Sequence, residues 1–421
     1  MLGELALIGR DPTTGGYVRD AWSAADLGLR EWFAGEARRR GLDLREDRNG
    51  NLWAWWGDPS RQPGVVTGSH LDSVRQGGAY DGPLGVVSAF QALDVLRSRG
   101  VTPARPLGIA CFTDEEGARF GVPCMGSRLM TGLLDPDRAR GLRDDAGDSL
   151  ADVLAGAGRD PHALGADPET RAHVGVFVEL HVEQGRALAD LDAPVGVAAA
   201  IWPHGRWRFD FRGQANHAGT TLLADRDDPM LAYAAAVLAA REAAVRHGVV
   251  ATFGKVRVSP NNANAIPGLV SAWLDARGAG EKEVRALVEE LTDLVNLPRS
   301  GTVAPTVGGP PPGDSAADGP VAPSRAVEVR EESWTPVVDF EVALRDRVAT
   351  AAARSTGGPV PVLPTGAGHD AGILASAGVP SAMLFVRNPT GVSHSPEEHA
   401  EETDCAAGVR ALAEVLEELC R

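Results

Sequence analysis

Short apolar runs alternate with helical patterns through the first half of this chain, and this order restricts its fold more than any other feature. The pair Val65-Val66 belongs to one expected strand, a helical pattern covers about 83–97, and apolar runs at 107–112 and 174–180 predict two more strands. Strands that alternate with helices form α/β domains with a largely parallel sheet. The sequence therefore predicts a mixed α/β fold that closes with a helix from about 396 to 420.

A second pattern begins after Ile201 and predicts an inserted α+β domain at 203–335. It contains one strand, an Ala-rich helix, two strands, an amphipathic helix and a last strand near 326–334. This β-α-β-β-α-β order is typical of ferredoxin-like domains. A chain of 421 residues also exceeds what one hydrophobic core usually serves, so we expect a main domain built from 1–202 and 336–421 around the insert.

A Gly- and Pro-rich stretch at 298–323, which includes GGPPPG, interrupts the insert. Such a composition buries too little apolar surface to fold by itself, so it predicts a surface loop. A functional lid is the alternative, because some long loops have functions.

The charge balance excludes several classes of partner. Lys and Arg number 41 against 57 Asp and Glu, which gives a formal net charge of -16 and a pI near 5.1. We therefore expect neither nucleic-acid nor anionic-membrane binding. No signal peptide and no apolar stretch of about 18 residues is apparent, so a soluble, cytoplasmic protein is expected. The four cysteines have no CxxC spacing and are read as buried free thiols: Cys111, Cys124, Cys405 and Cys420.

Five residues whose side chains bind metals well come from five separate stretches: His70, Asp81, Glu116, His181 and His394. Most of them follow an expected strand, and ligands bind at the carboxyl ends of the strands in open α/β sheets. Taken alone, each has an ordinary alternative, such as a structural histidine, a helix N-cap or a solvated acid. Together they predict a metal site.

Two more acids complete this expected site. Glu115 directly precedes Glu116 in TDEEG, and adjacent residues of an extended chain point in opposite directions. One glutamate can therefore bind a metal while Glu115 remains available as a general base, which is what metal-assisted hydrolysis requires. Asp72 can accept the proton of the His70 nitrogen that faces away from the metal and so fix the tautomer.

The ligand types also indicate the metal. Imidazoles and carboxylates without a thiolate suit a pair of divalent ions such as zinc or manganese. Two dications opposite Asp81 and Glu116 leave a formal charge of about +2, or about +1 when Glu115 is included, so the site can attract an anionic substrate.

Eight segments in this order carry a resemblance to a known family: GSHLDSV, GGAYDGPLG, FTDEEGARF, LHVEQG, GQANHAGTT, NANAIPG, GAGHDA and GVSHSPEE. They resemble the amidohydrolase branch of the dimetal aminoacylase and carboxypeptidase superfamily. This branch contains N-carbamoyl-L-amino-acid hydrolases, β-ureidopropionases and allantoate amidohydrolases. The resemblance covers nearly the whole chain except 298–323.

By this resemblance, His70 and His181 hold one of two metal ions per subunit, and Asp81 places one oxygen on each ion. Glu116 and His394 complete the second site, and Glu115 is the base. The insert is then a lid and dimerisation domain whose closure excludes water.

The resemblance also implies a set of substrate contacts: Gln184, His217, Asn264, Arg277, Gly368 and His369, with Asp370 bordering the pocket. Arg277 suits a bidentate grip on a carboxylate, while Asn264 and Gln184 suit its polar groups. His217 polarises the scissile carbonyl and comes from the other subunit of a homodimer. An exposed charge for Arg277 and a turn former for Asn264 are the ordinary alternatives.

The implied reaction is hydrolysis of a ureido C–N bond in a small anionic ureido compound. Allantoate is the first expectation, because GRDPTTGGYVRDAW and GNLWAWWGD resemble bacterial allantoate amidohydrolases. An N-carbamoyl-L-amino-acid hydrolase or β-ureidopropionase is the alternative. A metallopeptidase of the same superfamily and an inactive metal-binding scaffold are further alternatives, and retention of Glu115 argues against the scaffold.

Overall fold

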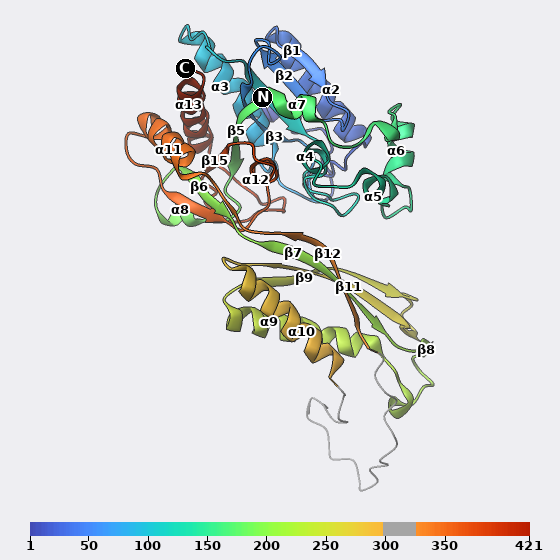
Figure 1. Ribbon diagram of the computed structural model, residues 1–421. Helices are drawn as coiled ribbons and strands as arrows, with labels where there is room; N and C mark the ends of the chain where they lie inside the picture. The colour runs from blue at the N-terminus through green and yellow to red at the C-terminus, as the bar shows by residue number, and fades with distance from the viewer. Residues whose placement is uncertain (298–325) are drawn as a thin grey trace. The chain divides into compact units, whose positions relative to one another are not determined.

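The computed structural model describes residues 1–297 and 326–421 and divides into two compact units (Figure 1). The first unit contains Met1–Ile201 and Val338–Arg421, and the second contains Trp202–Val337. The loop expected at 298–323 lies outside the described residues. No helix in the described ranges is long and apolar enough to cross a bilayer.

One nine-stranded sheet organises the first unit, in the order β1-β2-β4-β3-β5-β15-β6-β13, with β14 beside β6. Its strands are β1 (Asp43–Glu46), β2 (Leu52–Trp56), β3 (Gly64–His70), β4 (Leu107–Phe112), β5 (Val174–Val182), β6 (Val195–Ile201), β13 (Val338–Asp339), β14 (Val362–Thr365) and β15 (Ser381–Val386). The four central strands β4, β3, β5 and β15 run parallel, whereas the outer pairs are mostly antiparallel. The predicted mixed α/β fold is confirmed.

Helices cover both faces of this sheet, which explains why β3, β4 and β15 are buried along their whole length. The long helices pack against one face: α2 (Ala24–Arg39), α3 (Pro83–Ser98), α11 (Val342–Thr356) and α13 (Glu402–Leu419). The short helix α12 (Asp370–Ser376) contributes to the core on the other face. The remaining helices are α1 (Leu2–Leu5), α4 (Met125–Thr131), α5 (Pro136–Gly141), α6 (Leu150–Gly156), α7 (Pro168–His173) and α8 (Ala187–Asp190), with a 3-10 turn at Pro161–Ala163.

The second unit has a four-stranded antiparallel sheet in the order β12-β7-β11-β9. Its elements are β7 (His204–Arg212), α9 (Pro229–His247), β9 (Val250–Ser259), β11 (Leu269–Arg277), α10 (Glu281–Asn296) and β12 (Glu328–Thr335), with the short pair β8 (Asn216–His217) and β10 (Ala265–Ile266) and a 3-10 turn at Leu223–Asp225. This is the expected ferredoxin-like order. Helix α10 buries Val284, Leu287, Val288 and Leu291, the apolar positions that recur at helical spacing.

The last helix differs from the expectation, because it begins at Glu402 and not near 396. The preceding segment has another role: the Glu398 carboxylate accepts hydrogen bonds from the backbone N–H groups of Tyr80 and Asp81. The spacing of apolar residues that predicts a helix cannot reveal a contact between residues more than 300 positions apart in the sequence.

Candidate metal centre

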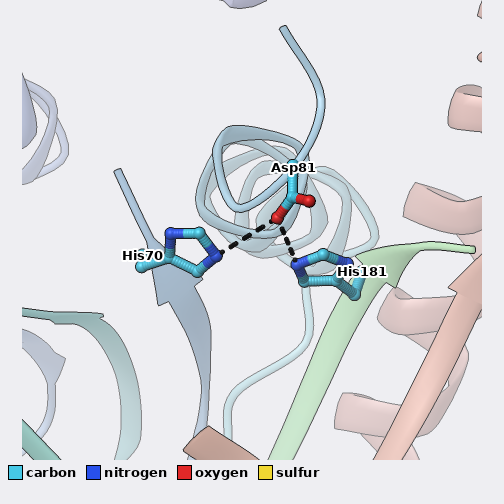
Figure 2. Close-up of side chains that lie close together, drawn as sticks. All are labelled: His70, Asp81 and His181. Atoms are coloured by element: carbon cyan, nitrogen blue, oxygen red, sulfur yellow. Dashed lines mark ion pairs between the residues drawn. The ribbon is translucent and has the colours of Figure 1, made fainter. Parts of the chain in front are cut away.

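Two neighbouring parallel strands deliver the first pair of histidines. His70 is the last residue of β3, and His181 is the next-to-last residue of β5, so both lie at the carboxyl edge of the sheet. Both side chains are buried, and their ring centroids are 5.8 Å apart (Figure 2). The parallel pairing of the strands therefore produces the predicted meeting of residues that are far apart in sequence.

Asp81 faces both histidines from the loop before α3. Its Oδ1 lies 3.5 Å from His70 Nε2 and 3.2 Å from His181 Nε2 (Figure 2). The next residue is Gly82, whose φ is +82°, and a Cβ there would lie 2.4 Å from the His70 ring. Glycine is required at this position for the loop to approach His70.

The other oxygen of Asp81 faces a second group. Asp81 Oδ2 lies 3.5 Å from His394 Nε2, and the same nitrogen lies 3.5 Å from Glu116 Oε2. The ligand atoms of His70, Asp81 and His181 lie within 4.8 Å of one another, as do those of Asp81, Glu116 and His394. Asp81 therefore belongs to both groups, with one oxygen turned to each.

The geometry of the histidines fits a cation. Ligands bound tetrahedrally at about 2.0–2.1 Å lie about 3.3 Å apart, which matches the Asp81 contacts. The Nδ1 atoms of His70 and His181 lie 3.1 Å and 2.9 Å from the carbonyl oxygens of Asp72 and Val182. Their buried Nε2 atoms have no hydrogen-bond partner within the described residues. Imidazoles held by Nδ1, with Nε2 turned inward, are arranged as metal ligands usually are.

The electrostatics of these side chains are dominated by burial and mutual contact. Burial alone would lower the pKa of His70, but Glu115, Asp72 and Asp81 outweigh it and raise that pKa well above its usual value. Burial would raise the pKa of Asp81, but His181 and His70 hold it well below its usual range. Burial and the Asp81 carboxylate raise the pKa of Glu116 to about 7. Without cations, the cluster therefore retains protons.

Asp72 differs from the expectation. Its main-chain carbonyl, not its carboxylate, is the nearer partner of His70 Nδ1, since the carboxylate Oδ1 lies 3.5 Å away. The carboxylate instead accepts the backbone N–H groups of Glu115 and Glu116, each at 3.1 Å. These N–H groups lie just beyond the end of β4 and need an acceptor, so Asp72 orients the two-glutamate segment.

Glu115 belongs to none of the three-residue groups of described residues that could hold a cation. Its Oε2 lies 3.7 Å from His70 Nε2, so the carboxylate stands beside the first group. Burial raises the pKa of Glu115 well above its usual value, and Asp370 and Glu116 act in the same direction. A buried carboxylate of raised basicity beside a cation site can move a proton.

Glu398 and Ser393 hold the Asp81 loop and were not predicted from the sequence. Glu398 Oε1 accepts the N–H groups of Tyr80 at 2.8 Å and Asp81 at 2.9 Å. The Ser393 hydroxyl lies 3.1 Å from Glu398 Oε2 and 3.2 Å from Asp81 Oδ2. A signal was present: both residues flank His394 in GVSHSPEE.

Gln184, which is expected to contact substrate, lies against the second group. Its Nε2 donates to Asp81 Oδ2 at 2.7 Å and lies 3.3 Å from His394 Nε2. The side chain can therefore contact a ligand only at the edge of this group.

His369 follows Gly368 and lies beside the first group, with its ring centroid 4.5 Å from that of His181. The buried carboxylate of Glu179, another residue missed in the sequence, could complete a third group with these two histidines. Its oxygens already accept the Ser69 hydroxyl at 2.8 Å and the Ala371 N–H at 3.0 Å, so we assign it a structural role.

The other expected substrate contacts belong to the second unit. His217 and Asn264 are exposed neighbours, since Ala218 N donates to the Asn264 carbonyl at 3.0 Å. Arg277 lies at the far end of β11, where Asp275 accepts from its Nε at 2.6 Å and its Nη2 at 2.9 Å. The structure thus brings His217 and Asn264 together and places Arg277 apart from them.

Comparison with known proteins gives a consistent result. The model of peptidase family M20/M25/M40 matches residues 66–418. The chain is 35% identical to an N-carbamoyl-L-amino acid amidohydrolase of Geobacillus stearothermophilus, over 100% of this chain and 97% of that protein. It is 32% identical to an allantoate amidohydrolase of Escherichia coli (strain K12), over 99% and 95% of the two chains.

A solved structure agrees with these relatives. The amidase of the hydantoinase/carbamoylase family from Burkholderia vietnamiensis superposes with a TM-score of 0.86 at 28% identity, covering 100% of this chain and 96% of that one. The residues that can hold a cation, the fold and the relatives agree with the resemblance found in the sequence. The chain belongs to peptidase family M20/M25/M40 and is an amidohydrolase, an enzyme that hydrolyses C–N bonds.

Proposed function

We propose that this enzyme cleaves the ureido C–N bond of a small carboxylate with the aid of two divalent cations, zinc or manganese. The observation that carries the proposal is the position of Asp81, which turns one oxygen to each of two ligand groups while Glu115 stands beside them and belongs to neither. His70 and His181 would complete one cation site, and Glu116 and His394 the other.

The cations, when bound, would polarise the scissile carbonyl and lower the pKa of water. Glu115 would take a proton from the attacking water and return it to the leaving nitrogen. Its buried position excludes competing solvent, and Asp72 holds its backbone in place. Gln184 and His369, at the borders of the two groups, would contact the substrate beside Gly368.

Allantoate is the proposed substrate: hydrolysis of one ureido C–N bond would release ammonia, carbon dioxide and a ureido-substituted α-amino acid, which would lose a second ammonia to water to give the ureidoglycolate-type product. The opening segments of the sequence support it, as does the relative named allantoate amidohydrolase. The relative that is 35% identical supports a second candidate, an N-carbamoyl-L-amino acid. Both compounds are carboxylates, and Arg277, whose guanidinium plane Asp275 fixes, would grip the carboxylate.

We further propose that the enzyme acts as a homodimer in which His217 and Asn264 serve the partner's substrate. Within one second unit, β11 extends from Leu269 beside β10 to Arg277 at its other end. Eight residue steps at about 3.4 Å separate the two ends by about 27 Å, which no small substrate spans. A second copy of the chain would supply the missing contacts.

Helix α9 offers an apolar surface for such an assembly. Leu231, Leu238 and Val245 recur every seven residues along it and have exposures of 65%, 69% and 72%. Such a stripe is typical of a helix that packs against a partner. We expect Leu238→Glu to convert a dimer into monomers in sedimentation experiments, whereas Arg241→Glu on the same helix should leave it dimeric.

The substrate is tested by ammonia release from zinc- or manganese-loaded protein. Allantoate, an N-carbamoyl-L-amino acid, its D-enantiomer, β-ureidopropionate and a dipeptide would be compared at equal concentrations. Higher kcat/KM for allantoate is expected. A higher value for the N-carbamoyl-L-amino acid would establish the second candidate, and activity on the dipeptide alone would overturn the ureido proposal.

A further inference from the structure

Cys124 lies against the proposed base. Its Sγ donates a hydrogen bond to Glu115 Oε1 at 3.1 Å, and the side chain is buried. Cys124 also has a left-handed backbone conformation, with a φ of +53°. Non-glycine residues seldom adopt this conformation, and those that do are enriched at functional sites.

The backbone fixes the thiol relative to the glutamate. Cys124 N donates to the Glu115 carbonyl at 2.6 Å, Met125 N donates to the Asp114 carbonyl at 3.0 Å, and Gly126 N donates to the Thr113 carbonyl at 2.9 Å. The first turn of α4 therefore binds the entire segment that carries Glu115. Cys124 and Glu115 can move relative to each other only if these backbone hydrogen bonds break.

The thiol is a donor throughout the neutral pH range. Burial raises the pKa of Cys124 well above its usual value, and the adjacent Glu115 adds to this effect. A protonated thiol has one hydrogen to donate, and a carboxylate is the stronger acceptor in a charge-assisted bond.

The two oxygens of Glu115 consequently have different surroundings. Oε1 accepts from Cys124, whereas Oε2 lies 3.7 Å from His70 Nε2, beside the first ligand group. We propose that Cys124 is a positioning residue, whose thiol holds Glu115 Oε1 so that Oε2 faces the water to be deprotonated. This inference rests on the proposed role of Glu115 as the base. The sequence indicates Cys124 only as a buried free thiol. The proposal gives this thiol a part in the reaction.

Three substitutions distinguish a hydrogen-bond donor from a side chain that only fills space. Cys124→Ala removes the donor without adding a branched side chain, Cys124→Val removes the donor and fills the space but strains the backbone at a φ of +53°, and Cys124→Ser keeps a donor. Loss of one such bond should lower kcat about 2- to 10-fold in the Ala variant, with KM and metal content unchanged. The Ser variant should retain most of the activity.

Cys111→Val is the matched control, because Cys111 is also a buried thiol and lies on β4. Its kcat should remain that of the unmodified enzyme. Wild-type kcat in Cys124→Ala, or a Ser variant as slow as the Ala variant, would overturn the proposal.

A measurement on the metal-loaded enzyme that does not require turnover tests the hydrogen bond directly. The difference infrared spectrum between the wild type and Cys124→Val isolates the S–H stretching band of Cys124. The band should move to higher wavenumber in Glu115→Ala, because the acceptor is gone. An unmoved band would overturn the positioning role, whereas full turnover by Glu115→Gln would overturn the proposed base itself.

Discussion

The candidate ligands of the first unit and the candidate substrate contacts of the second unit are built in opposite ways. His70, Asp81 and His181 are buried, and each lies within 3.5 Å of another member of the group. His217 and Asn264 are exposed and lie at the short pair β8 and β10, which precedes the start of β11, whereas Arg277 lies at the other end of β11. The candidate ligands lie together at one place in the first unit, whereas the candidate substrate contacts lie at two separate places in the second unit.

The difference follows from the sheets. Parallel strands buried on both faces end at one edge, so residues that follow them converge. An antiparallel sheet with helices on one face spreads its polar residues along the other. One chain can therefore bring the candidate metal ligands together alone, while the proposed substrate contacts would need a second chain.

The substitution Glu115→Gln is the strongest test of the candidate site in the first unit. We expect turnover to fall by a factor on the order of 10² or more, because the amide cannot accept the proton from water. Metal content, measured by plasma emission spectrometry, should stay unchanged, since Glu115 belongs to neither ligand group. Loss of metal together with activity would instead make Glu115 a ligand.

Glu398→Ala tests how far the metal centre depends on the segment around His394. The Asp81 loop loses its acceptor for two N–H groups, so we expect metal affinity to fall about 10- to 100-fold. Titration against a chelating dye measures this change. The exposed neighbour provides the control, and Glu397→Ala should bind metal as the wild type does; equal affinities in both variants would contradict the role of Glu398.

The pH dependence of metal affinity should distinguish this buried centre from a solvent-exposed metal site. The pKa of His70 is raised in the metal-free protein, so a cation must displace a proton that the imidazole still holds at neutral pH. Metal affinity should therefore rise with pH, by about tenfold per pH unit for each proton displaced. Below about pH 7, the raised pKa of Glu116 adds a second proton and steepens the dependence. Dissociation constants that stay constant between about pH 6 and about pH 8 would show that no proton is displaced.

Mixing two inactive variants tests directly whether two subunits share one substrate site. The expected recovery of activity is the smallest of these effects. In a mixed dimer of His217→Ala and Glu115→Gln, one site combines an intact Glu115 with an intact His217. Random pairing should restore about one quarter of wild-type activity. If both residues acted within one chain, the mixture would stay inactive, and each protein mixed with itself provides the baseline.

The sequence predicted that these candidate ligands lie close together, because each of them has a local signal. His70, Glu116 and His181 come at or just after buried runs, and Asp81 precedes a helix. Strand β4 has the predicted bounds, whereas strands β1, β2 and β6 were not predicted. Strands β1 and β2 have only four and five residues, and the partners of β6 all follow the inserted unit in the sequence.

The residues that support the ligands could not be found in the same way. Glu398 holds a loop 317 residues away, and Glu179 accepts from a backbone N–H 192 residues away. The Asp72 carboxylate was expected to hold His70 and lies 3.5 Å from its Nδ1, but it also accepts the backbone N–H groups of the glutamate segment, which was not expected. Such roles depend on the folded arrangement and leave no pattern in the local sequence.

The strand order of the nine-stranded sheet also determines how much of the chain must be synthesised before this sheet can form. Every sheet neighbour of β6, namely β15, β13 and β14, is encoded after the inserted unit. Until residue 386 has left the ribosome, β5 and β6 both expose unpaired edges to other nascent chains. We therefore expect an aggregation-prone intermediate during translation, and the central sheet to be complete only once β15 has been inserted between β5 and β6.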